Sequence, residues 1–190
     1  MTPQHEENSR KAELIRVAAR LFREQGYERT TVRDLGQAVG LQSGSLFYHF
    51  RSKEAILVAV MAQGISSTTE QLSAALAQAN TLDQRVAALF QVHLHSLLGE
   101  NQAALEVMLY EWRSVSAASK PDLIVLRDRY EALWQDVLDE AAQAGRVKTD
   151  TRLLRRTILG SLHWTVQWYR PEGGMSVDEL AARMLALVLR

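Results

Sequence analysis

The 190-residue chain contains no cysteine, so disulfide bonds and thiolate metal sites are excluded. It has only three prolines and ten glycines, and with 47% apolar residues this composition is typical of a globular, helix-rich protein. No apolar run reaches the length of a membrane span, and the first residues, MTPQHEENSRK, contain no apolar signal core. We therefore expect a cytoplasmic protein with no membrane partner.

A net charge is absent too, because 22 basic residues balance 22 acidic ones. Residues 1–53 nevertheless carry nine basic and six acidic side chains, which leaves 13 basic and 16 acidic side chains in the remainder. A basic N-terminal part joined to a mildly acidic body fits a protein whose N-terminal part approaches a polyanion such as DNA.

Catalytic motifs are also missing. The sequence has no nucleophile elbow, phosphate loop or paired-carboxylate motif. We predict that the protein is not an enzyme, has no cofactor and holds no metal ion. A helical enzyme or a ligand carrier with an N-terminus that looks like a DNA-binding domain is the alternative from another class.

Apolar residues recur at helical spacing along the whole chain, so we predict an all-α protein of about nine helices without a strand. Gly26, Gly40, Gly99 and Gly145 are placed to end helices. Beside two short helices near residues 31–39 and 43–50, longer ones are expected over residues 9–25, 53–77, 81–98, 102–116, 121–144 and 150–169 and from 176 to the C-terminus.

Residues 30–54, TTVRDLGQAVGLQSGSLFYHFRSKE, predict a helix, a tight turn, a short second helix and the start of a third. Thr31 can cap the first helix with Asp34 as its capping-box partner, and Gly40 suits a left-handed turn. Leu46 and Phe50 share one buried face of the short helix. Such a short polar helix, held by its neighbours, can lie in the DNA major groove.

This stretch resembles the DNA-binding domain of TetR-type transcriptional regulators, in which a segment like Gly-Ser-Leu-Phe-Tyr-His-Phe at 44–50 precedes a Ser-Lys-Glu helix start. The resemblance covers roughly residues 9–60 and extends more loosely to the whole chain. It implies a helix-turn-helix DNA-binding domain over residues 9–55 and a helical ligand-binding and dimerisation domain over residues 56–190. Phe47 departs from the pattern, because many relatives carry there a Tyr whose hydroxyl contacts a phosphate.

We predict DNA contacts from the short helix and its surroundings. The Gln42 amide can pair with adenine, Gly44 allows close approach of the backbone, and Lys53 starts a helix whose N-terminus favours a phosphate. The predicted DNA-binding residues are Thr31, Arg33, Gln42, Ser43, Gly44, Ser45, Tyr48, His49 and Lys53.

The segment 153–169 is apolar on nearly every side, and a helix of this kind must be buried on every side. Together with the last helix it predicts a four-helix bundle between two copies of the chain, as the resemblance also implies. Burial within one chain is the alternative. The predicted interface residues are Ile158, Leu162, Thr165, Trp168, Met184 and Leu187.

All four tryptophans lie beyond residue 110, where they supply an aromatic interior with a few polar groups. Such an interior lines a small-molecule pocket or forms a ligand-free core, and His93 can be a core histidine or a pocket group. The resemblance implies a pocket. The predicted ligand-binding residues are Met61, Phe90, His93, Met108, Glu111, Trp112, Tyr130, Trp134, His163 and Trp164.

Residues 159–174, LGSLHWTVQWYRPEGG, resemble the branch of TetR-type regulators that controls degradation of fatty acids, sterols or aromatic acids and often senses acyl-CoA thioesters. The resemblance implies a homodimeric repressor that leaves a palindromic double-stranded DNA operator when an apolar small-molecule effector, such as an acyl-CoA, binds. An activator of the same fold, or a regulator controlled by a protein partner, is the alternative.

Overall fold

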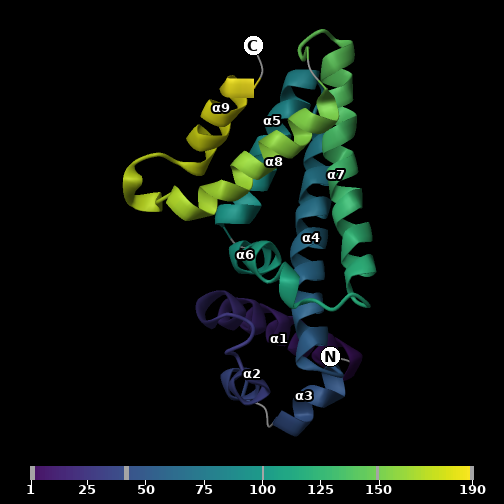
Figure 1. Ribbon diagram of the computed structural model, residues 1–190, viewed down its shortest axis with the longest axis vertical. Coiled ribbons are helices and arrows are strands. Elements are labelled where there is room, and N and C mark those ends of the chain that lie inside the picture. The colour runs from purple at the N-terminus through teal and green to yellow at the C-terminus, as the bar shows by residue number, and fades with distance from the viewer. Residues whose placement is uncertain (1–2, 41–42, 100, 149, 189–190) are drawn as a thin grey trace. The chain divides into compact units, whose positions relative to one another are not determined.

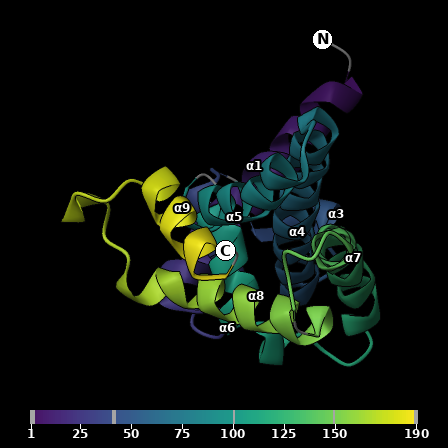
Figure 2. The same cartoon turned by 90° about the horizontal axis from the view of Figure 1, so that it is seen from above.

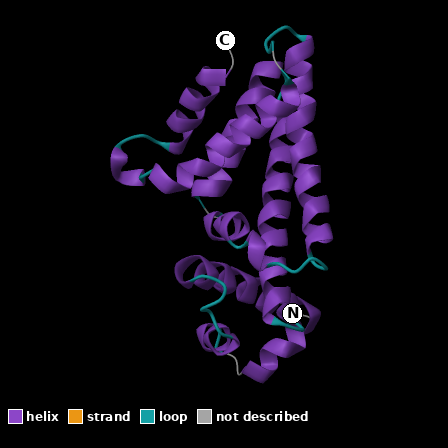
Figure 3. Cartoon of the chain, viewed as in Figure 1, coloured by secondary structure: helices purple, strands orange, loops and turns teal. Residues whose placement is uncertain are grey.

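The computed structural model describes residues 3–40, 43–99, 101–148 and 150–188, all of which form helices or their connections without a strand (Figure 3). The predicted all-α class is confirmed. The helices are α1 (Pro3–Gln25), α2 (Val32–Ala38), α3 (Ser43–His49), α4 (Lys53–Gln78), α5 (Leu82–Leu98), α6 (Gln102–Tyr110), α7 (Lys120–Gln143), α8 (Thr151–Trp168) and α9 (Val177–Val188), with 3₁₀ turns η1 (Trp112–Ser114) and η2 (Pro171–Gly173).

Local sequence signals set most of the helix ends. Thr31 and Thr81 both form complete capping boxes, in which the threonine hydroxyl and the third helical side chain satisfy backbone N–H groups in both directions. Gly26 and Gly40 have φ angles of 85° and 69°, which residues with a side chain rarely adopt, and they end α1 and α2 as predicted. The helix predicted over residues 102–116 is shorter, because α6 ends at Tyr110 and a 3₁₀ turn follows.

The chain forms two compact units, and the first contains Met1–Gly64 together with Ala103–Ile124. Its core is built from the buried sides of α1, α2 and α3, including Leu14, Phe22, Leu35 and Leu46. α2 packs against both α1 and α3 (Figure 1). A Cβ on Gly64 would lie 2.9 Å from the Ala104 Cβ, so a glycine is needed where α4 passes α6.

Polar contacts also attach residues 103–124 to the first unit. Arg23 on α1 forms an ion pair of 2.8 Å with Glu106, and the Tyr27 N–H donates to Glu111 Oε1 at 3.0 Å. The Ser116 N–H donates to Glu54 Oε1 at 2.9 Å. These compact units therefore differ from the domains expected from the sequence, in which all residues after 55 form one body.

The second unit contains Ile65–Gln102 and Val125–Arg190. Within it, α5 packs against α8 and α9, and all three lie side by side in the two views (Figures 1 and 2). Fully buried side chains such as Leu89, Trp134 and Leu162 form its core. No helix of the described residues is long and apolar enough to cross a membrane.

Candidate functional site

The start of α2 is held by its capping residues. The Thr31 hydroxyl donates to Asp34 Oδ2 at 2.7 Å and accepts from the Asp34 N–H at 3.2 Å. Hydrogen bonds from the Thr31 side chain and backbone lower the pKa of the Asp34 carboxyl. Thr31 is exposed but its hydroxyl serves the cap, whereas Arg33, in the first turn of α2, is exposed and lowers the pKa of Asp34 further by its charge.

Leu46 on α3 and Phe50, directly after the helix, are buried and hold the helix, as predicted. The opposite side presents two aromatic rings to solvent, since Phe47 is 52% exposed and Tyr48 is 77% exposed. The His49 ring packs edge-on against Tyr48, with 5.3 Å between the ring centroids. Two large exposed rings on so short a helix form a surface suited to a partner.

Part of the predicted DNA-binding set cannot be placed. Gln42 lies outside the described residues, and the side chains of Ser43, Gly44 and Ser45 are also outside them, although these three residues form the first turn of α3. Their DNA contacts remain predictions.

Lys53 does not have the predicted role at a phosphate. Its ammonium donates to the backbone oxygens of Tyr27 at 2.9 Å, Thr30 at 3.1 Å and Glu28 at 3.4 Å, and lies 4.1 Å from the centre of the Tyr27 ring. An ammonium has three N–H donors, so these carbonyls use all of them. Lys53 therefore holds the connection between α1 and α2, which corrects the prediction.

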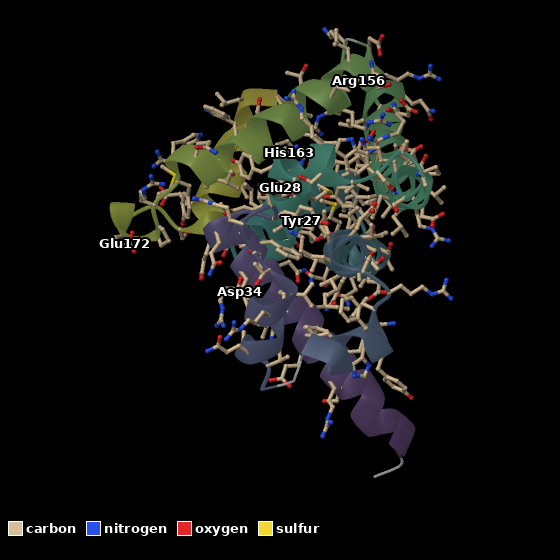
Figure 4. The ribbon with its side chains drawn as sticks, turned by 60° about the horizontal axis from the view of Figure 1, so that its bottom comes forward. Tyr27, Glu28, Asp34, Arg156, His163 and Glu172 are labelled. Carbon is tan, nitrogen blue, oxygen red and sulfur yellow. The ribbon has the colours of Figure 1, made fainter. Side chains whose placement is uncertain are left out.

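In the second unit, five predicted ligand-binding residues form one buried cluster, which we call the ring cluster: Phe90, His93, Tyr130, Trp134 and His163. His93 Nδ1 lies 2.7 Å from the Tyr130 hydroxyl, and the His93 ring centroid lies 5.0 Å from that of His163 and 5.8 Å from that of Trp134. Phe90 packs on Trp134 with 5.7 Å between the ring centroids. Figure 4 marks His163 on α8.

Burial keeps the ionisable side chains of the ring cluster, His93, Tyr130 and His163, in their neutral forms. Loss of hydration lowers the pKa of His93 well below its ordinary value, and the nearby His163 lowers it further. Burial lowers the pKa of His163 to about 4 and raises the pKa of the Tyr130 hydroxyl. All three side chains are therefore neutral at pH 7, and the cluster offers hydrogen bonds without charge.

The other predicted ligand-binding residues lie elsewhere. Trp164 is 65% exposed on the side of α8 opposite the core, so it does not belong to the buried interior expected from the sequence, and its ligand contact stays a prediction. Met61, Met108, Glu111 and Trp112 belong to the first unit. The Glu111 carboxylate accepts from the Tyr27 N–H and the Ser114 hydroxyl, which makes it a support for the α1–α2 connection.

The two sides of α8 have different surroundings. Ile158, Leu162 and Thr165 face the interior of their own chain and are between 0% and 4% exposed, so they cannot meet a partner as predicted. The opposite side is exposed and also apolar, and we call it the α8 outer face: Leu153, Thr157, Gly160, Ser161, Trp164 and Trp168. Because 3.6 residues complete a turn, these six positions form one stripe along the helix.

The two predicted interface residues on α9 differ in exposure. Leu187 is 85% exposed, whereas Met184 is half-buried.

A groove of about 480 Å³ lies between α7 and α8, and four arginines line it: Arg127, Arg152, Arg155 and Arg156. Arg155 is held by Glu131 Oε2 at 3.0 Å and Gln135 Oε1 at 2.9 Å. Asp128, Glu131 and Asp136 also line the groove, so its basic excess is small. Arg156 and His163 both lie on α8, seven residues apart (Figure 4).

Known proteins resemble both parts of the chain. The family described as bacterial regulatory proteins of the tetR family matches residues 14–60, and the tetracyclin repressor-like C-terminal domain matches residues 79–190. The HTH-type transcriptional repressor KstR2 of Mycobacterium tuberculosis is 32% identical over 188 residues, which cover 96% of this chain and 92% of the repressor.

Two solved structures have closely similar folds. The superantigen PfiT is 46% identical with a TM-score of 0.85, and the match covers 96% of this chain and 97% of PfiT. AibR, solved in complex with isovaleryl coenzyme A and operator DNA, has a TM-score of 0.86 at 20% identity and covers 94% of this chain and 97% of AibR. At that identity the likeness to AibR shows the fold alone.

Proposed function

Because the chain belongs to the TetR family of transcriptional regulators, which are DNA-binding proteins and not enzymes, we propose that it binds a palindromic operator as a homodimer and releases it when an apolar effector binds. The observation that carries the proposal is the capped α2–α3 pair, which presents Arg33, Phe47 and Tyr48 to solvent while Leu46 and Phe50 anchor it. A rigid helix with an exposed recognition side is what major-groove binding requires.

The exposed side chains suit different parts of DNA. Arg33 can bind a guanine edge or a phosphate, and the Tyr48 hydroxyl can donate to a phosphate. Phe47 lacks that hydroxyl, but its exposed ring can contact a thymine methyl group. α2 and α3 together therefore offer one apolar and two polar contacts.

The α8 outer face supports the homodimer. Leu153, Trp164 and Trp168 expose apolar surface along one stripe, and an exposed apolar stripe of this kind marks an interface more often than a solvated surface. Gly160 and Ser161 interrupt the stripe with small side chains, which lets a second helix approach closely. In a two-fold dimer the same stripe meets its own copy, and the two recognition helices enter major grooves about 34 Å apart.

An acyl-CoA thioester fits the second unit as an effector. The ring cluster offers apolar surface with neutral hydrogen-bonding groups, while the arginines of the α7–α8 groove can bind phosphates. Arg156 and His163 are seven residues apart, or about 10 Å along the α8 axis, so one extended ligand can reach both. AibR, a protein of the same fold, was solved with an acyl-CoA and operator DNA.

The mechanism needs an effector that binds one arrangement of the chain more tightly than another. α4 and α7 both continue from one compact unit into the other, so they are the elements that can transmit a change. The effector lowers operator affinity only by the ratio of its affinities for the two arrangements, and DNA lowers effector affinity by the same factor.

Operator release by a thioester tests the proposal. DNA selected from a random library by the full-length protein supplies a labelled operator for fluorescence anisotropy. We expect a two-fold symmetric sequence, two chains per site, and release by decanoyl-CoA but not by free CoA. An asymmetric site bound by one chain would contradict the homodimer, and no response to apolar thioesters of any chain length would contradict the effector class.

A further inference from the structure

One of the two ring nitrogens of His93 lacks a hydrogen-bond partner among the described residues. His93 is 4% exposed, its Nδ1 meets the Tyr130 hydroxyl, and its Nε2 has no partner in the part of the chain that the structure describes. Buried nitrogens that lack a partner are rare in folded proteins and call for an explanation. The ring centroids of Trp134 and His163 lie 5.8 Å and 5.0 Å from that of His93, and neither ring forms a hydrogen bond with Nε2 among the described residues.

The hydrogen bond to Tyr130 favours one of the two neutral tautomers of His93. The Tyr130 O–H lies 2.7 Å from His93 Nδ1, and donation to that nitrogen gives the buried hydroxyl proton an acceptor, whereas the other tautomer would leave it without one among the described hydrogen bonds. A neutral imidazole has a single N–H, so when Nδ1 accepts, the proton lies on Nε2. In this tautomer the buried nitrogen without a partner is a donor, and an oxygen that accepts would complement it.

The charge of that oxygen follows from its surroundings. The ring cluster consists of neutral and apolar side chains, and His93 and His163 resist protonation because they are buried. An ionised carboxylate placed against Nε2 would be buried without a counter-charge, which is strongly unfavourable. A carbonyl oxygen of a thioester, ester or ketone accepts the same hydrogen bond without that penalty.

We propose that the His93 Nε2–H recognises a neutral carbonyl oxygen of the effector, while Phe90 and Trp134 hold the adjoining apolar part and Tyr130 fixes the histidine tautomer. This inference rests on the proposed function only in placing the effector in the second unit. It adds a selection rule: the protein senses the thioester, ester or ketone and rejects the free acid, which is the product of thioester hydrolysis. The free acid exposes a carboxylate at the same position.

Four probes of equal chain length test this rule on the full-length protein by isothermal titration. Decanoyl-CoA and S-decyl-CoA differ only in the carbonyl oxygen, and methyl decanoate and decanoate differ in charge. We expect decanoyl-CoA to bind about tenfold or more tightly than S-decyl-CoA, since the oxygen completes a buried hydrogen bond. Methyl decanoate should bind more tightly than decanoate.

The double variant His93→Phe/Tyr130→Phe removes both partners of the hydrogen bond and keeps ring-shaped side chains. It should bind decanoyl-CoA and S-decyl-CoA equally, and it should melt at the wild-type temperature or above, because the orphaned donor has gone. The control His95→Gln changes an exposed histidine on the same helix and should keep the wild-type discrimination. Nitrogen chemical shifts of His93 should show the Nε2–H tautomer at pH 7.

Each outcome has a distinct meaning. Equal binding of decanoyl-CoA and S-decyl-CoA by the wild type, or discrimination that survives in the double variant, overturns the inference, even if both ligands release operator DNA and the proposed function stands. A double variant that melts well below the wild type makes His93 a structural residue and also overturns it. Binding of methyl decanoate without binding of any CoA derivative supports the inference and removes acyl-CoA as the effector. If none of the four probes binds, the inference and the effector class both fail, while operator binding is judged separately.

Discussion

The two compact units use their polar side chains in opposite ways. In the first unit, Lys53 directs all its donors to three backbone carbonyls, and Glu111 and Glu54 each accept a backbone N–H. In the second unit, His93 is more deeply buried, yet one nitrogen has no partner among the described residues. Completed hydrogen-bond networks make a structure rigid, whereas a buried polar group without a partner is costly. The comparison separates Lys53, whose donors are all paired, from His93, whose Nε2 we propose a ligand completes.

The largest expected effect concerns the α8 outer face. Trp164→Glu places a charge at the centre of the exposed stripe, where two copies would bury it against its own counterpart without a cation. We expect the variant to sediment as a monomer in analytical ultracentrifugation. Its operator affinity should be lower than that of the wild type by a factor on the order of 10³, because a single recognition helix makes half the contacts. A dimer that persists would place the interface away from this face.

The inner side of α8 supplies a matched control. Leu162 is fully buried in its own chain, so Leu162→Ala should lower the free energy of unfolding by about 2–5 kcal/mol through a cavity. The variant should remain dimeric at temperatures where it is folded. If Leu162→Ala instead separates the protomers without changing stability, the two sides of α8 have been assigned the wrong way round.

Lys53→Met tests the paired polar groups of the first unit. The variant keeps the aliphatic stem but leaves the carbonyls of Tyr27 and Thr30 without their cation, and we expect a loss of about 2–3 kcal/mol in the free energy of unfolding. Binding to all DNA sequences should weaken while the slope of log K against log salt stays unchanged, because no phosphate contact is lost. A slope reduced by about 2 for the dimer would restore Lys53 as a phosphate ligand. Arg51→Ala, an exposed neighbour, is the control for stability.

Acid should affect the second unit at a higher pH than the first. The folded state holds His163 at a pKa of about 4 against an ordinary value of 6.5, so between these values the unfolded chain binds more protons. Stability is therefore fully present above pH 6.5 and is lost as the pH falls toward 4, by about 2 kcal/mol between pH 7 and pH 5 for His163 alone. His93 adds to the loss in the same direction.

Chemical denaturation of the wild type and of His163→Phe at pH 7 and pH 5 checks this prediction. The variant should lose most of the His163 part of the pH dependence. Asp34 and Glu54 have lowered pKa values, so their stabilising effect disappears only at more acidic pH, below the window of the histidines. Equal pH dependence in variant and wild type would mean that His163 is not protected from protonation.

The smallest expected effect is that of Tyr48→Phe. The side chain is 77% exposed, so removal of its hydroxyl should leave the melting temperature unchanged. One lost phosphate hydrogen bond should lower DNA affinity by about 1 kcal/mol per recognition helix, equally for operator and random DNA. A change in sequence preference would instead show that Tyr48 contacts a base.

Features that depend on neighbours in sequence could be predicted. The capping boxes at Thr31 and Thr81 and the left-handed glycines at 26 and 40 need only a few adjacent residues, and all are present. The buried side of α3 followed from the spacing of Leu46 and Phe50. The grouping of aromatic and histidine side chains in the second unit was also predictable, because residues at helical spacing on α5, α7 and α8 face one core.

Features that depend on distant backbone atoms could not be predicted. The partners of Lys53 are carbonyl oxygens more than 20 residues away, and any residue type could supply them. On α8 both sides are apolar, so hydrophobicity could not distinguish the side that packs in the chain from the side that is exposed. Gly160 and Ser161 are small enough to favour the close approach of another helix, and both are exposed.

The attachment of residues 103–124 to the first unit has a consequence for chimeric biosensors. A chimera that joins a foreign DNA-binding domain to residues 56–190 would carry Glu106, Glu111 and the Ser116 N–H, but not Arg23, the Tyr27 N–H or Glu54, with which they pair. The transplanted part would meet an unmatched surface on every foreign domain that lacks these groups. A functional chimera should therefore replace residues 1–64 and residues 103–124 of this chain together with the matching segments of the foreign protein. The ring cluster and the α8 outer face of this chain would then be kept.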